Sequence, residues 1–289
     1  MTFDRNAITD TYYLSYGRWG KIKKSEFKFL FEYVNKFYGE TTSALSQWSN
    51  FGGMVHDILE ITLGQPKSKQ EDLMEKAVEN KIRKMTPADK DLFSRRLENT
   101  LPALISICEK YEIIALEEPL ELIYKSFPPD SPLARKLMAI TPFNKKPDEF
   151  LHLGFHGYMD AYVIDTDGKR CILDWKTGKF SEDKLEGYRQ QTQVYTHAKR
   201  LKGDLVESSK IVYIESKAME KEVDVGPRTC KALYEEMFED FITRVDSICN
   251  GDLLKSCCGG AWFCNFSSIC ASLKGQLPID QDFIDLIIG

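Results

Sequence analysis

The chain has 289 residues, of which 43% are hydrophobic and 29% are charged, and its formal net charge is −5. This composition is typical of a globular protein with a full core. The negative net charge excludes a protein that is basic over its whole surface, but it is compatible with a local basic cleft for nucleic acid. The sequence contains no run of about 18 apolar residues and no secretory signal, so we expect a cytoplasmic protein that does not associate with membranes.

The first third of the chain is predicted to be helical. Apolar residues recur at three- and four-residue intervals in segments 23–39 and 49–64, and each of these segments ends at a glycine. Segments 66–85 and 87–111 keep the helical pattern at a higher density of charge. We interpret this charge as the solvent-facing side of helices; a basic strip for a polyanion is the alternative.

The middle of the chain changes to a strand pattern. Segment 111–124 is rich in branched apolar residues, whereas 127–149 is rich in proline and is predicted to be an irregular insertion or lid. Segments 150–164 and 169–178 alternate with a period of two around the turn at 165–168, which predicts a β-hairpin.

A helix at 185–201, a strand at 208–217 and a helix at 230–251 are predicted next, before a cysteine-rich tail. This order of strands and helices predicts one mixed α/β domain over residues 1–289. We divide it into a helical region (1–111), a central strand-rich core (112–216), and a C-terminal helix with the cysteine-rich tail (217–289).

Two aspartates interrupt the predicted hairpin. If its loop is the three residues 166–168, with Gly168 in the left-handed conformation, counting outwards places Asp160 opposite Asp174. Opposed side chains are about 5 Å apart at Cβ, where two carboxylates need a cation or a shared proton. Mg²⁺ suits such oxygen ligands. The alternative is that both aspartates lie on the solvent side of the hairpin, but Asp174 interrupts an apolar run, and a buried carboxylate requires a partner.

These residues resemble the nuclease core of the PD-(D/E)XK superfamily, and in particular its RecB-like branch, which includes CRISPR-associated and AddB-type nucleases. That branch has a Gly-x-x-Asp strand, an Asp/Glu-x-Lys strand, a helix with Gln-x-x-x-Tyr, and an upstream helix with Gly-x-x-His. The motifs are scattered over about residues 50–216, and their order makes the match specific although each motif alone is weak. The matching residues are Gly157 and Asp160, Asp174 and Lys176, Gln191 and Tyr195, and Gly53 and His56.

The resemblance implies a restriction-endonuclease-like fold, with a mixed central sheet flanked by helices, and a role for each motif. Asp160 and Asp174 would hold Mg²⁺ or Mn²⁺, helped by His56 and the backbone carbonyl of Trp175. Lys176 would orient or deprotonate the attacking water and offset charge on the scissile phosphate. Two further residues, one helical turn apart, would position DNA or brace the lysine, namely Gln191 and Tyr195.

Several of these residues have a structural alternative. His56 could be a hydrogen-bonded helix histidine, Tyr195 a core residue and Gln191 a surface residue. Glu60, one turn after His56, could add a carboxylate, although a solvent-facing side chain is the simpler interpretation. His152 and His156 share the predicted strand face of Asp160, which makes His156 a rival ligand.

The tail contains four cysteines within fourteen residues, and its second half resembles the iron–sulfur tail of some RecB-like nucleases. Those proteins use one further cysteine near the N-terminus, which this chain lacks, since its first cysteine is Cys108. A [4Fe–4S] cluster, a zinc site and reduced thiols therefore remain as alternatives. The possible ligands are Cys257, Cys258, Cys264 and Cys270.

The resemblance implies a metal-dependent DNA nuclease, an exonuclease in our interpretation, that acts in DNA repair, recombination or the processing of phage or mobile-element DNA. Its partners would be DNA and a helicase or recombination protein. The alternatives are a DNA-binding or assembly subunit that keeps the fold without cutting, and a scaffold for a metal cluster in the tail.

Overall fold

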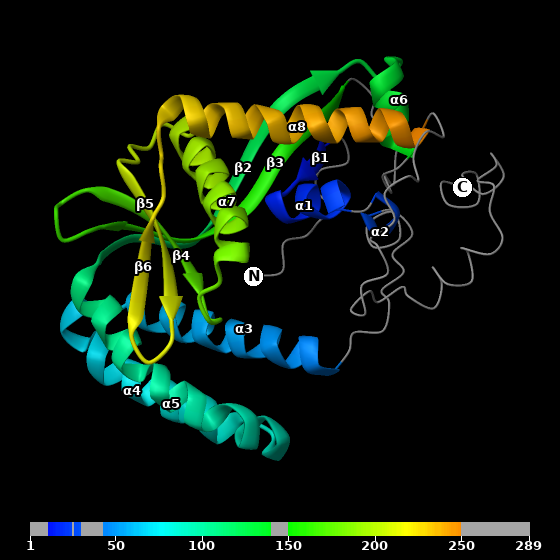
Figure 1. Cartoon of the computed structure of the whole chain (residues 1–289). Coiled ribbons are helices and arrows are strands. Elements are labelled where there is room, and N and C mark those ends of the chain that lie inside the picture. Colours follow the sequence, from blue (N-terminus) through cyan, green and yellow to red (C-terminus); the bar gives the residue numbers. More distant parts are fainter. Residues whose placement is uncertain (1–10, 25, 30–42, 140–149, 250–289) are drawn as a thin grey trace. The chain divides into compact units, whose positions relative to one another are not determined.

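A computed structural model describes residues 11–24, 26–29, 43–139 and 150–249. The chain forms two compact units: the first is built from Met1–Thr42, Glu121–His156 and Glu235–Gly289, and the second from Ser43–Leu120 and Gly157–Tyr234. Strands β2 and β3 and helix α8 contribute residues to both units (Figure 1). Because single strands and a single helix run through both units, the division into units does not decide whether residues 1–289 form one domain, which stays a prediction.

The first unit brings together three separate stretches of the chain. Strand β1 pairs in parallel with the first part of β3. Tyr12 of β1 stacks on Phe241 of α8 with ring centroids 5.3 Å apart, and the Trp19 indole donates a hydrogen bond to Asp240 at 2.7 Å. The elements are β1 (Thr11–Leu14), α1 (Tyr16–Lys24), α2 (Glu26–Phe29), α6 (Pro132–Ala139) and parts of β2 (Glu112–Phe127), β3 (Leu151–Ile164) and α8 (Pro227–Cys249).

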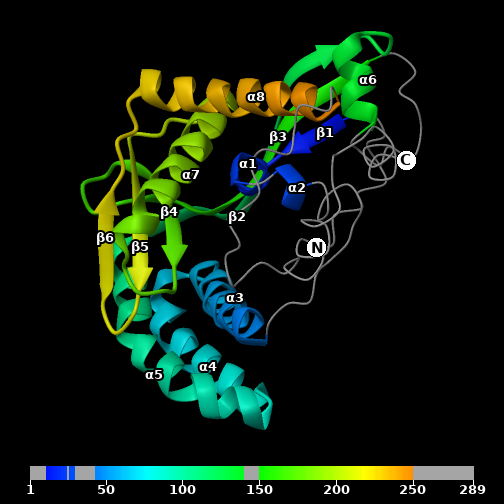
Figure 2. The same cartoon turned by 45° about the vertical axis from the view of Figure 1, so that its right-hand side comes forward.

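The second unit contains the other helices and the larger part of the sheet. In it β3 pairs with β4 antiparallel, β4 with β5 parallel, and β5 with β6 antiparallel (Figure 2). All described strands belong to one six-stranded mixed sheet in the order β1-β3-β4-β5-β6, with β2 paired to β3. The elements are α3 (Ser43–Leu63), α4 (Lys67–Lys84), α5 (Pro87–Lys110), β4 (Arg170–Lys176), α7 (Glu182–Leu201), β5 (Ser208–Ile214) and β6 (Ala218–Glu222).

Both faces of the sheet in the second unit are covered by helices. Alternate strand residues such as Leu173, Trp175 and Val212 are buried with the apolar side chains of α3, α4 and α5. The opposite face packs on α7, where Leu185 is buried together with Ile211 and Tyr213. Because both faces are buried, the central strands β4 and β5 are apolar on both sides, as is typical of parallel pairs in α/β sheets.

Local signals account for the start of α5 and for the turn between β3 and β4. The Thr86 hydroxyl accepts a hydrogen bond from the Asp89 amide at 3.2 Å and Pro87 occupies the first turn, so α5 begins where the sequence predicts. At the hairpin, the Asp165 amide donates to the Lys169 carbonyl at 2.9 Å and Gly168 has φ 76°. The hairpin therefore has the predicted three-residue loop with a left-handed glycine.

Some elements differ from the expectation. Segment 132–139 within the proline-rich stretch is a helix, α6, because Pro132 starts it with a suitable φ and the Ser131 hydroxyl caps the Ala134 amide at 3.2 Å. The predicted strand at 208–217 ends at Ile214 and is followed by a separate strand, β6. β1 was not expected, since four residues are too few for a periodic signal.

The mixed α/β class, with helices flanking a central sheet, is confirmed. Within the described residues, no helix is long and apolar enough to cross a membrane.

Candidate active site

The site begins at the C-terminal end of strand β4. Asp174 and Lys176 are two residues apart and therefore point to the same face, whereas Trp175 between them is buried against the opposite layer of helices. Asp174 is 2% exposed in an otherwise apolar stretch. Its Oδ2 atom lies 2.6 Å from Lys176 Nζ, so the buried carboxylate and the ammonium form a close ion pair.

Asp160 of β3 lies beside this pair. Residues 161–164 pair with 173–170, so the same register continued by one residue places Asp160 opposite Asp174, as the three-residue loop predicts. The Trp175 amide donates a hydrogen bond to Asp160 Oδ2 at 2.7 Å. Burial and repulsion from Asp174 raise the pKa of Asp160 to about 7, against the opposing effects of His56, Lys176 and the Trp175 amide. Simultaneous ionisation of the two carboxylates is therefore unfavourable unless a cation binds between them.

Helix α3 contributes His56 to the same place. Its Nδ1 atom lies 3.5 Å from Glu117 Oε1 and 3.8 Å from Asp160 Oδ1. Burial lowers the pKa of His56, but the adjacent carboxylates of Glu117 and Asp160 outweigh burial, and its pKa is raised above the ordinary value. The histidine thus faces carboxylate oxygens and is not an isolated polar residue on a helix.

Glu117 of β2 completes the group, although none of the sequence motifs includes it. Its φ of 45° is the only positive value of a non-glycine residue in the described part of the chain. Such a conformation is strained and persists only where the surroundings impose it. The neighbouring Glu118 makes an ion pair with Lys199 at 2.6 Å. The signal in the sequence was the run Glu117-Glu118-Pro119, two acids and a proline inside an apolar strand.

His56, Glu117 and Asp160 can offer ligand atoms that all lie within 4.8 Å of one another. Two carboxylates and an imidazole suit a divalent ion that prefers oxygen but accepts nitrogen, such as Mn²⁺ or Mg²⁺. The buried carboxylate of Asp174, on the opposed position of β4, is a further oxygen donor beside this group. The residues present therefore fit a divalent metal. The backbone carbonyl of Trp175 stays a predicted ligand.

Lys176 is held from two sides. Besides its ion pair with Asp174, its ammonium lies 4.7 Å from the centre of the Tyr188 ring. Burial lowers the pKa of Lys176, but Asp174 and Asp160 more than offset this effect, and the net shift is upwards. The side chain is therefore a cation that can donate hydrogen bonds and balance negative charge.

The loop after Lys176 is fixed by α3 and α5. The Arg96 guanidinium donates to the Thr177 carbonyl at 2.7 Å and lies over the Phe51 ring at 4.2 Å. A Cβ on Gly52 would meet Thr177 Oγ1 at 3.2 Å, whereas a Cβ on Gly53 would meet nothing within 4 Å. Gly52 thus provides the close approach of the helix to this loop.

Gln191 and Tyr195 on α7 are joined by a hydrogen bond from Gln191 Nε2 to the Tyr195 hydroxyl at 3.0 Å. Burial is the main cause that raises the pKa of Tyr195. The two side chains thus act as one rigid pair, and their contact with DNA stays a prediction.

The other residues considered have separate partners or lie in solvent. His156 Nε2 lies 3.6 Å from Glu121 Oε1, and His152 Nδ1 is hydrogen-bonded to Ser126 Oγ at 2.7 Å. Glu60 is exposed. The predicted cluster ligands Cys257, Cys258, Cys264 and Cys270 lie outside the described residues, whereas Cys108, Cys171 and Cys230 are buried thiols.

The family model of the PD-(D/E)XK nuclease superfamily matches residues 13–271 of this chain, a range that includes every residue of the site described above. No curated protein matches the chain.

Proposed function

Because the chain belongs to the PD-(D/E)XK nuclease superfamily, we propose that it is a Mg²⁺- or Mn²⁺-dependent deoxyribonuclease that hydrolyses phosphodiester bonds at DNA ends. The observation that supports this function best is the opposition of Asp160 and Asp174, with Lys176 on the same face and 2.6 Å from Asp174. Two buried carboxylates and a cation serve no purpose in a sheet that only has to fold, because apolar residues would be at least as stable there.

The metal would be held by Asp160 and Asp174, with His56 and Glu117 as further ligands. A divalent ion supplies an acidified water and stabilises negative charge on the phosphoryl group when it is bound. Asp160 is already aimed by the Trp175 amide at 2.7 Å. Glu117 is aimed by its strained backbone, with φ 45°. The site therefore needs little rearrangement of these two side chains before binding.

Lys176 would donate to a non-bridging oxygen of the scissile phosphate and balance the charge that develops there. The Lys176 side chain is 17% exposed, and its ammonium lies between Asp174 and the Tyr188 ring, which restricts its position. Besides charge balance, the role we assign to it is to orient or deprotonate the attacking water.

The biological setting remains part of the proposal. Exonuclease action, DNA repair or recombination or the processing of phage or mobile-element DNA, a cytoplasmic location and a helicase or recombination partner all derive from the resemblance of the motifs. The [4Fe–4S] cluster on the tail cysteines is likewise a proposal, which iron analysis and visible absorbance of purified protein would test.

The function is tested with end-labelled linear DNA and with covalently closed circular DNA, in Mg²⁺ and in Mn²⁺. Lys176→Ala is expected to lower the rate on linear DNA by at least about a hundredfold. Lys169→Ala is the matched control, because Lys169 is 53% exposed at the hairpin turn. Equal rates for wild type and Lys176→Ala would reject the mechanism, and a non-cutting subunit would show no cleavage by either protein. Cleavage of the circle would reject a strict exonuclease.

A further inference from the structure

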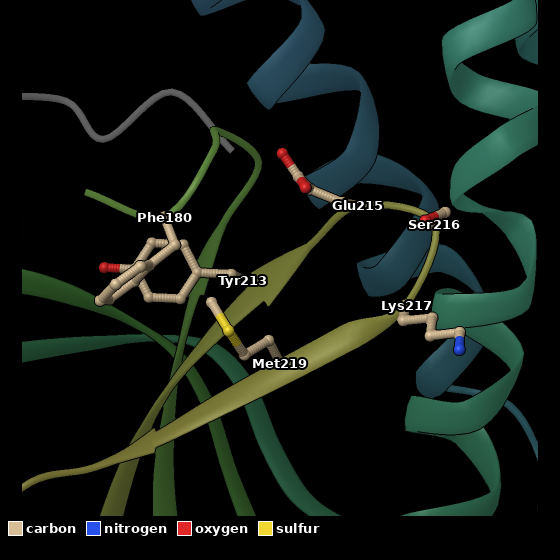
Figure 3. Close-up of a pocket in the computed structure, with 6 residues that line it drawn as sticks. All are labelled: Phe180, Tyr213, Glu215, Ser216, Lys217 and Met219. Atoms are coloured by element: carbon tan, nitrogen blue, oxygen red, sulfur yellow. The ribbon is translucent and has the colours of Figure 1, made fainter.

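A second feature lies beside the candidate active site, at the turn between β5 and β6. It is a pocket of about 210 Å³, which we call the hairpin pocket (Figure 3). It does not contain any of the residues assigned above to metal binding or catalysis. Its lining residues are Phe180, Tyr213, Glu215, Ser216, Lys217 and Met219.

The pairing of the strands places this pocket next to Lys176. Lys176 of β4 is the register partner of Tyr213 of β5, and Tyr213 is the partner of Met219 of β6. Directly paired residues point to the same face of a sheet, and neighbouring strands are about 4.8 Å apart. The hairpin pocket therefore begins one strand away from Lys176 on the catalytic face. Phe180 is also close in the chain, four residues after Lys176.

The walls of the pocket suit a flat ring. Phe180 meets Tyr213 edge to face, with ring centroids 5.3 Å apart and an angle of 86°, and Figure 3 shows Met219 beside the Tyr213 ring. Met219 lines the pocket and is 38% exposed, so its side chain is available for contact with a ligand. A cavity of about 150 Å³ holds one benzene molecule, and drug-sized ligands need about 300–1,000 Å³. The hairpin pocket thus matches a single planar ring system.

Charged groups flank the pocket. Tyr213 is 2% exposed, and its hydroxyl is buried, so the residue offers the pocket the side of its ring. Lys221 Nζ lies 4.6 Å from the centre of the Phe180 ring, and Lys217 lines the turn. Glu215 is the acidic residue of the lining.

From these observations we propose that the hairpin pocket binds the base of an unpaired nucleotide next to the phosphate that is cleaved. The base would pack against Phe180, Met219 and the side of the Tyr213 ring, while its phosphate lies towards Lys176. This inference rests on the proposed nuclease function. A base that is stacked within a duplex cannot enter such a pocket without being unstacked. The preferred substrate is therefore single-stranded DNA or a frayed end.

The test measures the binding of a fluorescein-labelled, single-stranded 12-nucleotide DNA to the full chain by fluorescence anisotropy. Ca²⁺ replaces Mg²⁺ so that binding is measured without cleavage. A set of oligonucleotides carries one abasic position each, moved stepwise along the strand. Stacking of one base on an aromatic side chain changes affinity by about fivefold to a hundredfold. We expect one abasic position, or two adjacent ones, to weaken binding to wild type by about tenfold, and the other positions to have little effect.

Matched variants identify the pocket as the cause. Phe180→Leu keeps an apolar side chain without a ring and is expected to bind all oligonucleotides of the set equally, whereas Phe180→Tyr should keep the positional effect. Tyr213→Phe should also keep the positional effect, because the hydroxyl that it removes is buried and the ring stays in place. Loss of the effect in Phe180→Leu, with an unchanged melting temperature, would then identify the ring of Phe180 as its cause.

The inference is overturned if no abasic position weakens binding to wild type, if the intact oligonucleotide does not bind, or if Phe180→Leu keeps the positional effect. These outcomes are distinct from failure of the nuclease function. Position-dependent binding without cleavage in any metal would support the pocket and reject the nuclease. Cleavage that depends on Lys176, with a flat abasic series, would reject the pocket alone.

Discussion

Replacing Asp160 by Asn should stabilise the metal-free protein and at the same time remove its response to metal. Asp160 and Asp174 occupy opposed positions on β3 and β4. Burial and repulsion from Asp174 raise the pKa of Asp160 to about 7. Asparagine has nearly the same size, and its Oδ1 can accept the Trp175 amide hydrogen that Asp160 accepts at 2.7 Å. The variant therefore removes a charge without opening a cavity.

The sign and size of the effect follow from the shift of the pKa. The folded protein holds the Asp160 proton up to about pH 7, whereas an unfolded aspartate releases it near pH 3.9. The free energy of unfolding of the wild type therefore decreases as the pH rises through this window. Each pKa unit corresponds to about 1.4 kcal/mol, which sets a ceiling of about 4 kcal/mol. Residual solvent contact at the site reduces the expected gain of the variant to about 2 kcal/mol above pH 7.

Urea unfolding in EDTA at pH 4.5 and pH 8 measures this difference. We expect Asp160→Asn to exceed the wild type by about 2 kcal/mol at pH 8 and by much less at pH 4.5. Addition of Mg²⁺ or Mn²⁺ at pH 8 should raise the melting temperature of the wild type but not of the variant. The control is Asp167→Asn, since Asp167 is 70% exposed at the hairpin turn and should change neither quantity. A variant that is less stable than wild type at pH 8 in EDTA would refute the reasoning.

Other substitutions test the rest of the site and the fold. Glu117→Gln should reduce the rise in melting temperature that Mn²⁺ causes, with little loss of stability. Glu118→Gln breaks the ion pair with the buried Lys199, so it should lower the free energy of unfolding by about 1–3 kcal/mol and keep the response to Mn²⁺. The reverse pattern would contradict the assignment of Glu117 as a metal ligand. Gly53→Ala should raise the free energy of unfolding by about 0.5–1 kcal/mol in urea titrations because its Cβ meets nothing within 4 Å, and Gly52→Ala should gain less because its Cβ would lie 3.2 Å from Thr177 Oγ1. Burial raises the pKa of Asp165, but the Lys169 and Asp167 amides and the Lys210 ammonium lower it on balance, so its contribution to stability is present above about pH 4 and lost as the pH falls. The melting temperature of Asp165→Asn should accordingly depend less on pH between about 4 and 2.5 than that of wild type. If the melting temperatures of the two proteins fall in parallel over this range, the ion pair between Asp165 and Lys210 is not formed.

The hairpin is the part of the site that local sequence determines most fully. One glycine, Gly168, fixes the loop length, and the loop length fixes which residues of β3 and β4 are opposed. A period of two then places Asp174 and Lys176 on one face. The position of both aspartates therefore depends only on interactions within about twenty residues of chain, which a single sequence expresses.

Glu117 could not be found in the same way. It lies next to Asp160 and His56 because β2, which follows helices α3 to α5 in the chain, pairs with β3, and because its own φ is 45°. No pattern of periodicity predicts a left-handed glutamate, since such a conformation is imposed by the surrounding tertiary structure. The hairpin pocket is similar, because Phe180, Tyr213 and Met219 come together only through the pairing of β5 with β4 and β6.

The composition of the first unit has a consequence for the order in which the protein folds during synthesis. Its Trp19 indole bonds to Asp240, and its Glu26 carboxylate bonds to Arg244 at 2.9 Å, so residues made first depend on partners made more than 200 positions later. The second unit, with all the proposed metal ligands, is complete once residue 234 has left the ribosome. Long-range contacts form slowly, and nascent chains fold by units as these become available. We therefore expect the second unit to fold before the C-terminal part of α8, the packing partner of β1, α1 and α2, has been synthesised.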